Sequence, residues 1–173
     1  MDSMAVVAIR SAALGDLPRI TEIYNHYVID TPITFDLERQ TPEQMTKWFA
    51  GHNAGGRYRM FVAEEEGVVI GFAGTGRFRD KAAYDTSVEA TIYCADGTAG
   101  RGIGSMLYRA LFDAIKNEDI HRIVAGITLP NDASLALHRK FGFTEVGVYR
   151  EVGRKLGRYW DAMWMDRPLR QSD

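Results

Sequence analysis

A glycine-rich turn between a strand pattern and a helix pattern constrains this chain more than any other feature. The turn reads Gly100-Arg101-Gly102-Ile103-Gly104-Ser105. Before it, Ser87 to Cys94 alternates apolar and polar residues, which is typical of a half-buried strand. After it, apolar residues recur at helical spacing as far as Ile115. A strand, a turn of exposed backbone and a helix N-terminus together form an arrangement that holds phosphate groups.

The spacing of these glycines excludes two familiar phosphate motifs. The dinucleotide fingerprint needs a further glycine where this chain has Ser105, and the nucleotide P-loop needs a Gly-Lys-Ser/Thr sequence that is absent. The remaining pattern exposes consecutive backbone N–H groups. Glycine-rich turns between a strand and a helix also occur for steric reasons alone, so the turn by itself leaves both readings open.

The composition favours a single domain of a soluble cytoplasmic protein. The chain has 173 residues and a formal net charge of −2, so we expect one domain over residues 1–173 and no general nucleic-acid binding. No apolar run is long enough to cross a membrane. The first residues, Met1 to Met4, lack the features of a signal peptide. A single cysteine, Cys94, excludes an internal disulfide and fits a reducing compartment.

Periodicity along the chain predicts the order βαα, consecutive strands and then αβαββ, which is a mixed α/β sheet. Strands are expected at Val6 to Ile9, Met60 to Glu64, Val68 to Ala73, Ser87 to Cys94, Ile123 to Ile127, Thr144 to Arg150 and Tyr159 to Met165. Helices are expected from about Asp16 to Tyr27, from Thr41 to about Gly51, over the stripe Met106, Leu107, Ala110, Leu111, Ala114 and Ile115, and after Asn131 as cap. The inner face of the last helix includes Leu135 and His138, or Leu137. Arg77 to Asp85 is expected to be a loop.

Short motifs spread along the chain resemble one known family when they are taken in order. They are Ile9-Arg10, Asp16-Leu17, Ile23-Tyr24-Asn25, Thr34-Phe35, Ala83-Tyr84-Asp85, Val88-Glu89, Leu129-Pro130-Asn131-Asp132, Ser134, Leu137-His138, Val152-Gly153-Arg154-Lys155, Gly157 and Trp160-Asp161. With the glycine turn, they resemble the GCN5-related N-acetyltransferase (GNAT) superfamily, and within it the branch of phosphinothricin and methionine sulfone (sulfoximine) acetyltransferases. The resemblance covers about residues 7–168.

The resemblance implies a mixed, centrally splayed sheet flanked by helices, and acetyl-CoA as co-substrate. The pyrophosphate is expected on the turn, and the pantetheine arm beside the backbone of the preceding strand and the amide of Asn131. The implied coenzyme-binding residues are Ile92, Tyr93, Cys94, Gly100, Arg101, Gly102, Ile103, Gly104, Ser105 and Asn131. The family turn usually begins with Gln or Arg where this chain has Ala99, so we expect somewhat weaker coenzyme binding.

Two residues are candidates for the chemistry. Glu89 lies among the polar positions of its strand and could simply face solvent. Aminolysis of a thioester needs a neutral amine, and a partly desolvated carboxylate can accept the amine proton directly or through water. The resemblance assigns this role to Glu89. It also implies that His138 protonates the leaving thiolate, although a lone histidine on a short helix is more often structural.

A basic and aromatic cluster precedes Glu89 and is the candidate site for the acceptor. It consists of Arg77, Phe78, Arg79, Lys81 and Tyr84. Arginine forks suit carboxylate, phosphinate or sulfone oxygens, and Arg79 is the residue we expect to hold the acid group. Phe35, Phe78 and Tyr84 are expected to wall the side chain. In the resembling branch, residues equivalent to Arg154, Lys155 and Arg158 can approach this site across a dimer interface.

We therefore expect an enzyme that transfers acetyl from acetyl-CoA to the amino group of a small amino acid or analogue, by direct attack in a ternary complex. The acceptors that fit are phosphinothricin, methionine sulfoximine or methionine sulfone. The alternatives are acetylation of a protein or peptide N-terminus and a non-catalytic acyl-CoA sensor.

Cys94 is expected to be a packed core thiol. His26, His52 and His121 lack metal-ligand spacing, so no metal is expected. A homodimer is implied, with no nucleic-acid or membrane partner.

Overall fold

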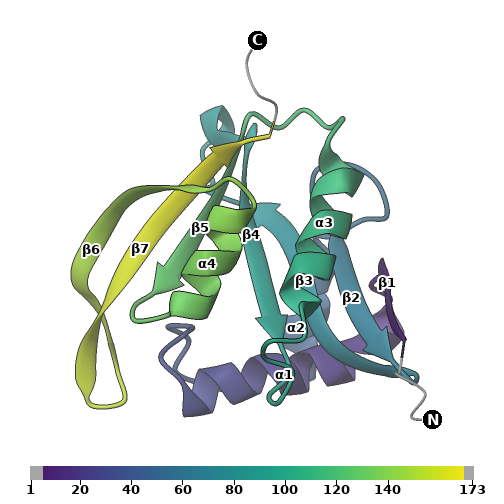
Figure 1. Cartoon of the computed structure of the whole chain (residues 1–173), viewed down its shortest axis with the longest axis horizontal. Coiled ribbons are helices and arrows are strands. Elements are labelled where there is room, and N and C mark those ends of the chain that lie inside the picture. Colours follow the sequence, from purple (N-terminus) through teal and green to yellow (C-terminus); the bar gives the residue numbers. More distant parts are fainter. Residues whose placement is uncertain (1–5, 170–173) are drawn as a thin grey trace.

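In the computed structural model, which describes residues 6–169, seven strands form one sheet in the order β1-β2-β3-β4-β5-β7-β6 (Figure 1). The strands are β1 (Val7–Ser11), β2 (Met60–Glu65), β3 (Val68–Arg77), β4 (Ser87–Cys94), β5 (Arg122–Thr128), β6 (Thr144–Lys155) and β7 (Arg158–Pro168). Neighbouring strands are antiparallel except for β4 and β5, which are parallel. The predicted mixed sheet is confirmed. The first residues, on which the signal-peptide prediction depends, lie outside the described range.

Helices cover both faces of the sheet (Figure 1). Helices α1 (Leu17–Asp30) and α2 (Pro42–Phe49) belong to one apolar cluster, and α3 (Ile103–Ile115) and α4 (Asp132–Lys140) pack into the other. Thr41 caps α2, with its side chain accepting from the backbone N–H of Gln44, and Pro42 is the first helical residue, both as predicted. No helix in the described range is long and apolar enough to cross a membrane.

Strand β4 presents two chemically different faces. Val88 and Ala90 are buried in the cluster beneath α3. Glu89 and Tyr93 alternate with them and face the side of α1, where the Tyr93 ring lies edge-on to Tyr24 at 5.0 Å between centroids. The predicted alternation is confirmed, and it places an acidic side chain on the face that α1 and α2 only partly cover.

Three sequence-based details need correction. The buried stripe of α3 is Ile103, Leu107, Tyr108, Leu111, Phe112 and Ile115, whereas Met106, Ala110 and Ala114 are only partly buried. The buried face differs from the predicted one because Ile103, Tyr108 and Phe112 also pack into the main apolar cluster. The helix already begins at Ile103, inside the predicted turn. Arg77 is the last residue of β3 and not part of a loop. Strand β6 continues to Lys155, so the C-terminal motif forms the end of a long hairpin and not a connection after it.

Strands β4 and β5 stay together over only a short distance. They pair at Ser87 with Arg122, Val88 with Ile123 and Glu89 with Val124. Beyond these residues β4 continues to pair with β3, and β5 continues to pair with β7. The two strands therefore open into a V whose point lies at Glu89, and Figure 1 shows the gap between them beside α4. The predicted central splay is confirmed.

The hairpin of β6 and β7 is tied to the segment between α1 and α2. Lys155 is only 5% exposed, and its Nζ donates to the carbonyl oxygens of Thr34 at 2.6 Å and Tyr27 at 3.3 Å. A Cβ on Gly153 would lie 2.5 Å from the Phe35 ring, so glycine is required for that close approach. Because both contacts hold the segment that contains Thr34 and Phe35, the hairpin fixes one wall of the adjoining cavities.

Lys155→Met should loosen the segment between α1 and α2. The substitution leaves two carbonyl oxygens without their donor, which costs roughly 1–3 kcal/mol. We expect a lower melting temperature and faster trypsin cleavage after the exposed Arg39, measured by mass spectrometry. Lys47→Met removes an exposed lysine of α2 and is the matched control. Cleavage after Arg39 at the control's rate would show that Lys155 does not hold this segment.

Candidate functional site

The V between β4 and β5 contains a narrow cavity of about 90 Å³. Its walls are the residues Ile33, Glu89, Ala90, Thr91, Ile92, Tyr93, Tyr108, Gly126, Ile127, Thr128, Asn131, Ser134 and His138. The cavity therefore brings together residues from the parted strands and from α4 that the sequence analysis assigned to separate roles. Predicted coenzyme residues Ile92, Tyr93 and Asn131 line it together with the two predicted catalytic residues.

Glu89 lies where this slot meets two larger cavities. It lines a cavity of about 360 Å³ on the side of α1 and α2, and another of about 430 Å³ that reaches β6 and β7. Within residues 6–169, its carboxylate forms no hydrogen bond or ion pair. Burial raises the pKa of Glu89, and the positive charge of Arg79 opposes that rise. A desolvated, unpartnered carboxylate open to three cavities is suited to accepting a proton.

Two adjoining cavities contain the aromatic residues that the sequence analysis predicted as walls of the acceptor site. Phe35 lines the cavity of about 430 Å³, with Tyr149 and Trp164 from the hairpin. Phe78 and Tyr84 line the other cavity, of about 500 Å³, and Tyr149 and Trp164 border it as well. The three aromatic residues predicted as walls are therefore distributed over two cavities that share the hairpin residues. The sequence analysis missed Tyr149 and Trp164, because only the pairing of β6, β7 and β5 brings them here.

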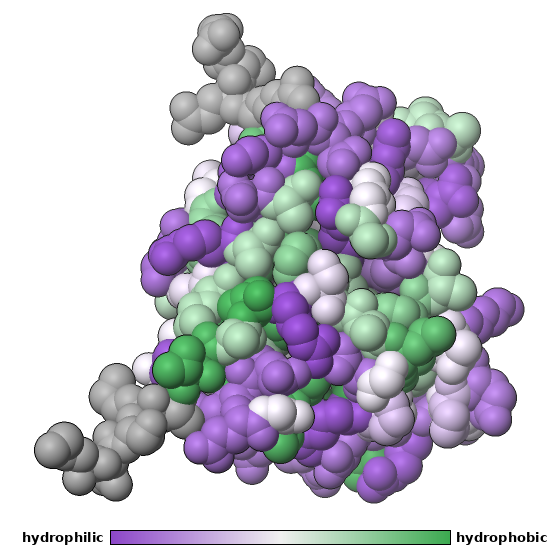
Figure 2. All heavy atoms as spheres, turned by 90° about the vertical axis from the view of Figure 1, so that its right-hand side faces the viewer, coloured by the Kyte–Doolittle hydropathy of each residue, from purple (hydrophilic) through white to green (hydrophobic). Residues whose placement is uncertain are grey.

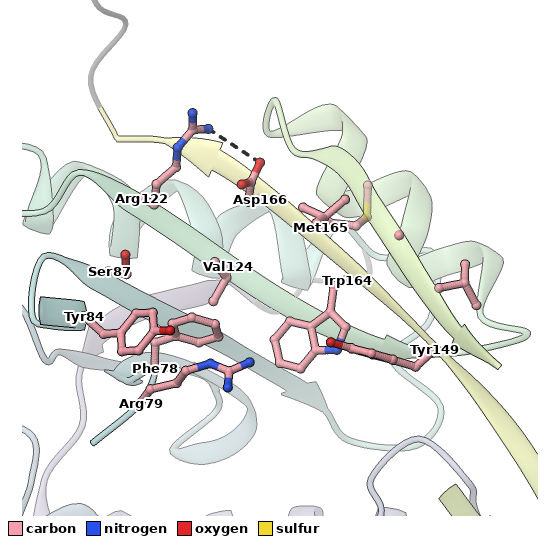
Figure 3. A pocket seen from close by; sticks show the side chains of 13 residues that line it. Phe78, Arg79, Tyr84, Ser87, Arg122, Val124, Tyr149, Trp164, Met165 and Asp166 are labelled. Atoms are coloured by element: carbon pink, nitrogen blue, oxygen red, sulfur yellow. Dashed lines mark ion pairs between the residues drawn. The ribbon is translucent and has the colours of Figure 1, made fainter. Parts of the chain in front are cut away.

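Arg79 and Arg77 have different environments. The Arg79 guanidinium lies 4.9 Å from the centroid of Phe78 and 5.7 Å from that of Tyr84. In Figure 3 it extends from beneath Phe78 toward Trp164, into the cavity. Arg77 instead forms an ion pair with Asp85 at 3.1 Å and lines none of the cavities described above. The geometry therefore favours Arg79 as the anion-binding side chain.

The glycine turn leads directly into α3. Gly100 and Gly102 have φ values of 75° and 77°, which glycine adopts without strain. Gly102 is the N-cap and supplies no side-chain acceptor, so the first N–H groups of α3 have no side-chain cap. A Cβ on Gly104 would lie 3.0 Å from Leu137, so this glycine permits close packing of α3 on α4. These free N–H groups at a helix N-terminus are suited to an anion.

Charged side chains flank the turn. Arg101 forms an ion pair with Glu65, so its charge is partly compensated. Lys140, at the end of α4, donates from Nζ to Ser105 Oγ at 2.8 Å. The sequence analysis missed Lys140, because no local signal in the chain places the end of α4 against the start of α3. It supplies a positive charge near the helix N-terminus.

His138 is buried and held by three groups. Its Nδ1 lies 2.7 Å from the carbonyl oxygen of Ser134, to which it donates, and 3.3 Å from the Ser134 hydroxyl. Nε2 is then unprotonated and accepts from the Tyr108 hydroxyl at 2.8 Å. Burial lowers the pKa of His138 and raises that of Tyr108. The imidazole is therefore neutral at pH 7, and its two nitrogens are both used within the protein.

The remaining predicted residues lie as follows. The Asn131 side chain accepts from the Ser134 N–H at 3.2 Å, which confirms it as the cap of α4. Cys94 packs against the main apolar cluster, and burial raises the pKa of its thiol to about 11. Its carbonyl oxygen accepts from the Tyr27 hydroxyl at 2.5 Å. That contact engages one backbone group at the end of the strand where the pantetheine arm was predicted.

The basic residues of the hairpin end lie apart from Arg79 within one chain. Arg154 stacks on Tyr159 at 5.9 Å and Arg158 on Trp160 at 4.1 Å, measured to the ring centroids. Lys155 is buried and bonded to two carbonyl oxygens, as described above. Its ammonium group thus positions the chain and lines none of the cavities near Glu89. Residues 6–169 contain no cluster of His, Cys, Asp and Glu that could hold a metal ion.

Comparisons with known proteins point to one family. The family model "Acetyltransferase (GNAT) domain" matches residues 9–164. The phosphinothricin N-acetyltransferase of Streptomyces coelicolor is 53% identical, over 98% of this chain and all of that protein. The L-methionine sulfoximine/L-methionine sulfone acetyltransferase of Salmonella typhimurium is 34% identical, over 94% of this chain and 95% of that protein.

A solved structure extends the likeness to three dimensions. It is that of a GNAT superfamily phosphinothricin acetyltransferase from Sinorhizobium meliloti in complex with acetyl-CoA. It matches with a TM-score of 0.88 and 33% identity, and the match covers 94% of this chain and 88% of that one. Since the family model and these relatives match almost the whole described chain, the protein belongs to the GNAT family of N-acetyltransferases.

Proposed function

We propose that this N-acetyltransferase acetylates the α-amino group of a small amino acid or analogue, of the phosphinothricin, methionine sulfoximine or methionine sulfone type. The observation that carries the proposal is the position of Glu89, a desolvated carboxylate at the point of the V, influenced by the charge of Arg79. The printed activities of the relatives from Streptomyces and Salmonella support this substrate class. We also propose that the protein works in the cytoplasm, which fits its one free thiol.

The residues present fit acetyl-CoA. Uncapped N–H groups at the start of α3, with Arg101 and Lys140 beside them, would hold the pyrophosphate. The unpaired edge of β4 after Glu89 offers backbone groups to the pantetheine arm, together with the Asn131 amide. Acetyl-CoA supplies an activated acetyl group as a thioester. Ala99 contributes no side-chain donor to this site, so backbone N–H groups carry most of the proposed contact.

Glu89 and Arg79 have separate roles in binding and activating the acceptor. Arg79 binds the acid group, and its planar fork matches two anionic oxygens. This contact places the amine beside Glu89, which accepts its proton, because most of the free amine is protonated near pH 7. The neutral amine then attacks the thioester carbonyl directly in a ternary complex, so that the amide C–N bond forms, the C–S bond breaks and coenzyme A leaves as its thiolate. Backbone N–H groups on the edge of β4 that β5 leaves unpaired would stabilise the developing negative oxygen.

The proposed role of His138 changes with the geometry. The sequence analysis predicted a proton donor for the departing thiolate, and that role stays a prediction. Donation from Nε2 requires the imidazolium form, which burial disfavours, and also displaces the Tyr108 hydroxyl. We therefore propose that His138 mainly positions Tyr108 in the wall of the slot. Both residues still line the cavity, so they contribute to its shape and polarity.

We further propose a homodimer formed through the hairpin. Strand β6 is at the edge of the sheet, and its side chains include Val146 at 64% and Tyr149 at 58% exposure. An exposed apolar edge strand is a surface that a second copy can cover. The side of the molecule where β1 lies instead mixes polar and apolar residues (Figure 2). A partner on β6 would close the cavities that Tyr149 borders.

The substrate proposal is tested by release of free thiol from acetyl-CoA with a panel of amino acids. Phosphinothricin, methionine sulfoximine or methionine sulfone should support turnover, with α-N-acetylated product confirmed by mass spectrometry. A peptide with a free N-terminus, tested at the same concentration, should be a poor acceptor. Coenzyme binding without thiol release for any amine would instead indicate an acyl-CoA sensor, and a preference for the peptide would indicate N-terminal acetylation.

The assignment of Glu89 and Arg79 predicts a specific pH dependence. The acid limb of kcat/KM should lie above the pH of an ordinary glutamate titration, because burial raises the pKa of Glu89. Arg79 holds that pKa down, so Arg79→Gln should move the limb to higher pH and reduce activity most at low pH. Glu89→Gln should abolish the limb and lower turnover by roughly 100-fold or more. The matched control is Arg77→Gln, which should leave the limb in place. An unmoved limb in Arg79→Gln would contradict the coupling.

The dimer is tested by sedimentation equilibrium at neutral pH. We expect a mass of twice the 19.4 kDa chain. Val146→Asp introduces a charge on the exposed edge strand and should yield the monomer. Val68→Asp, at a residue that is 51% exposed near the other edge of the sheet, is the control and should remain dimeric. A monomeric parent protein would overturn the proposal.

A further inference from the structure

A cavity that Glu89 borders and Arg79 does not has no role in the proposed reaction. It lies between α1, α2 and the outer face of β4 and has a volume of about 360 Å³. We call it the aromatic chamber, and its walls are Tyr24, Thr34, Asp36, Gln40, Met45, Trp48, Phe72, Glu89, Thr91 and Tyr93. This volume is large enough for the side chain of an amino acid.

The rings of the chamber form a continuous series. Tyr24 lies 5.0 Å from Tyr93, Tyr93 lies 5.6 Å from Phe72, and Phe72 lies 6.2 Å from Trp48, measured between centroids. Successive rings are tilted or edge-on, so the series presents ring faces as well as edges to its surroundings. Aromatic faces attract cations, and tryptophan does so most strongly. The wall therefore combines a large apolar area with an affinity for positive charge.

The charged groups of the chamber all have the same sign. Glu89 and Asp36 are its carboxylates, and neither Lys nor Arg is among its wall residues. Two cations act on these carboxylates from outside the wall, Arg79 on Glu89 and Lys155 on Asp36. Asp36 receives hydrogen bonds from the Tyr24 hydroxyl at 2.7 Å and from Gln40 Nε2 at 3.2 Å, both on Oδ2. Its Oδ1 accepts none from the part of the chain that the structure describes. Two carboxylates and four rings in one cavity are arranged as an organic cation would require.

We propose that the aromatic chamber binds a cationic side chain of the acceptor, so that the enzyme also acetylates amino acids that carry a guanidinium or ammonium group. The proposal rests on the proposed acceptor site, because Glu89 borders both the chamber and the cavity that continues toward Arg79. An acceptor with its α-amine at Glu89 can direct its carboxylate toward Arg79. Its side chain then enters the chamber toward Asp36 and Trp48.

L-Arginine and L-citrulline form the decisive pair of acceptors. They have nearly the same shape, and neither side chain competes with the α-amine as a nucleophile, but only arginine is cationic. We expect kcat/KM for arginine to exceed that for citrulline by about tenfold, from one ring contact and one carboxylate contact. The assay follows thiol release from acetyl-CoA, with methionine sulfone as a reference acceptor.

Variants locate the effect in the chamber. Asp36→Asn keeps the size of the side chain and an acceptor for the Tyr24 hydroxyl but removes the charge. It should reduce the ratio of kcat/KM for arginine to kcat/KM for citrulline to about threefold or less. Trp48→Leu removes the ring with the strongest attraction for cations and should also lower this ratio. Asp30→Asn removes an exposed carboxylate paired with His26 on α1, outside the chamber, and should leave the ratio unchanged.

Each result decides between the two proposals. Arginine used no better than citrulline, or a ratio that both chamber variants leave intact, overturns the cation site, even where methionine sulfone is turned over well. Absence of turnover with every sulfone, sulfoximine and phosphinate acceptor overturns the proposed substrate class and leaves the cation site supported if arginine is preferred. Circular dichroism melting of each variant identifies one that fails to fold, and the other variant then carries the test.

Discussion

Strands β4 and β5 separate after three residue pairs, and their facing backbone edges lose the partners that a sheet normally provides. Buried backbone N–H and C=O groups need such partners. One carbonyl, that of Cys94, is satisfied by the Tyr27 hydroxyl. The others border a slot closed by α4 and by the buried Tyr108–His138 pair. The separation thus creates polar backbone suited to an extended amide-rich ligand, and it also fixes Glu89 at the point where that ligand would end.

The electrostatics of the site follow from this placement. Glu89 is the last residue of β4 that pairs with β5, so it is too enclosed for full hydration but has no ionic partner within the described range. Arg79 approaches from the segment after β3 and keeps the carboxylate from becoming a much weaker acid. Burial and a nearby cation therefore act in opposite directions on one group. The net result is a pKa of Glu89 above that of an ordinary glutamate, with the charge of Arg79 limiting the rise.

Local patterns predicted the elements better than their relative positions. The alternation of β4, the cap of α2 and the glycine turn depend on neighbouring residues, and the structure confirms them. The start of α3 was misplaced, because a glycine turn does not show where helical hydrogen bonds begin. Lys140, Tyr149 and Trp164 reach the cavities or the turn through long-range packing, which periodicity does not encode. The motif containing Lys155 was recognised, but its buried bonds to two carbonyl oxygens depend on the whole hairpin.

The segment between α1 and α2 connects these features. Thr34 lines the aromatic chamber and also the cavity of about 430 Å³, Phe35 lines the second of these, and Asp36 lines the chamber. A short segment rich in polar contacts would be mobile if only its own hydrogen bonds held it. Lys155 and Gly153 of the hairpin, and Thr128 of β5 through the Ile33 carbonyl, anchor it from outside. Because the same hairpin supplies Tyr149 and Trp164, a change in hairpin position would reshape both acceptor cavities together. The shape of these cavities therefore depends on how β6 and β7 pack against this segment, as much as on any single residue that lines them.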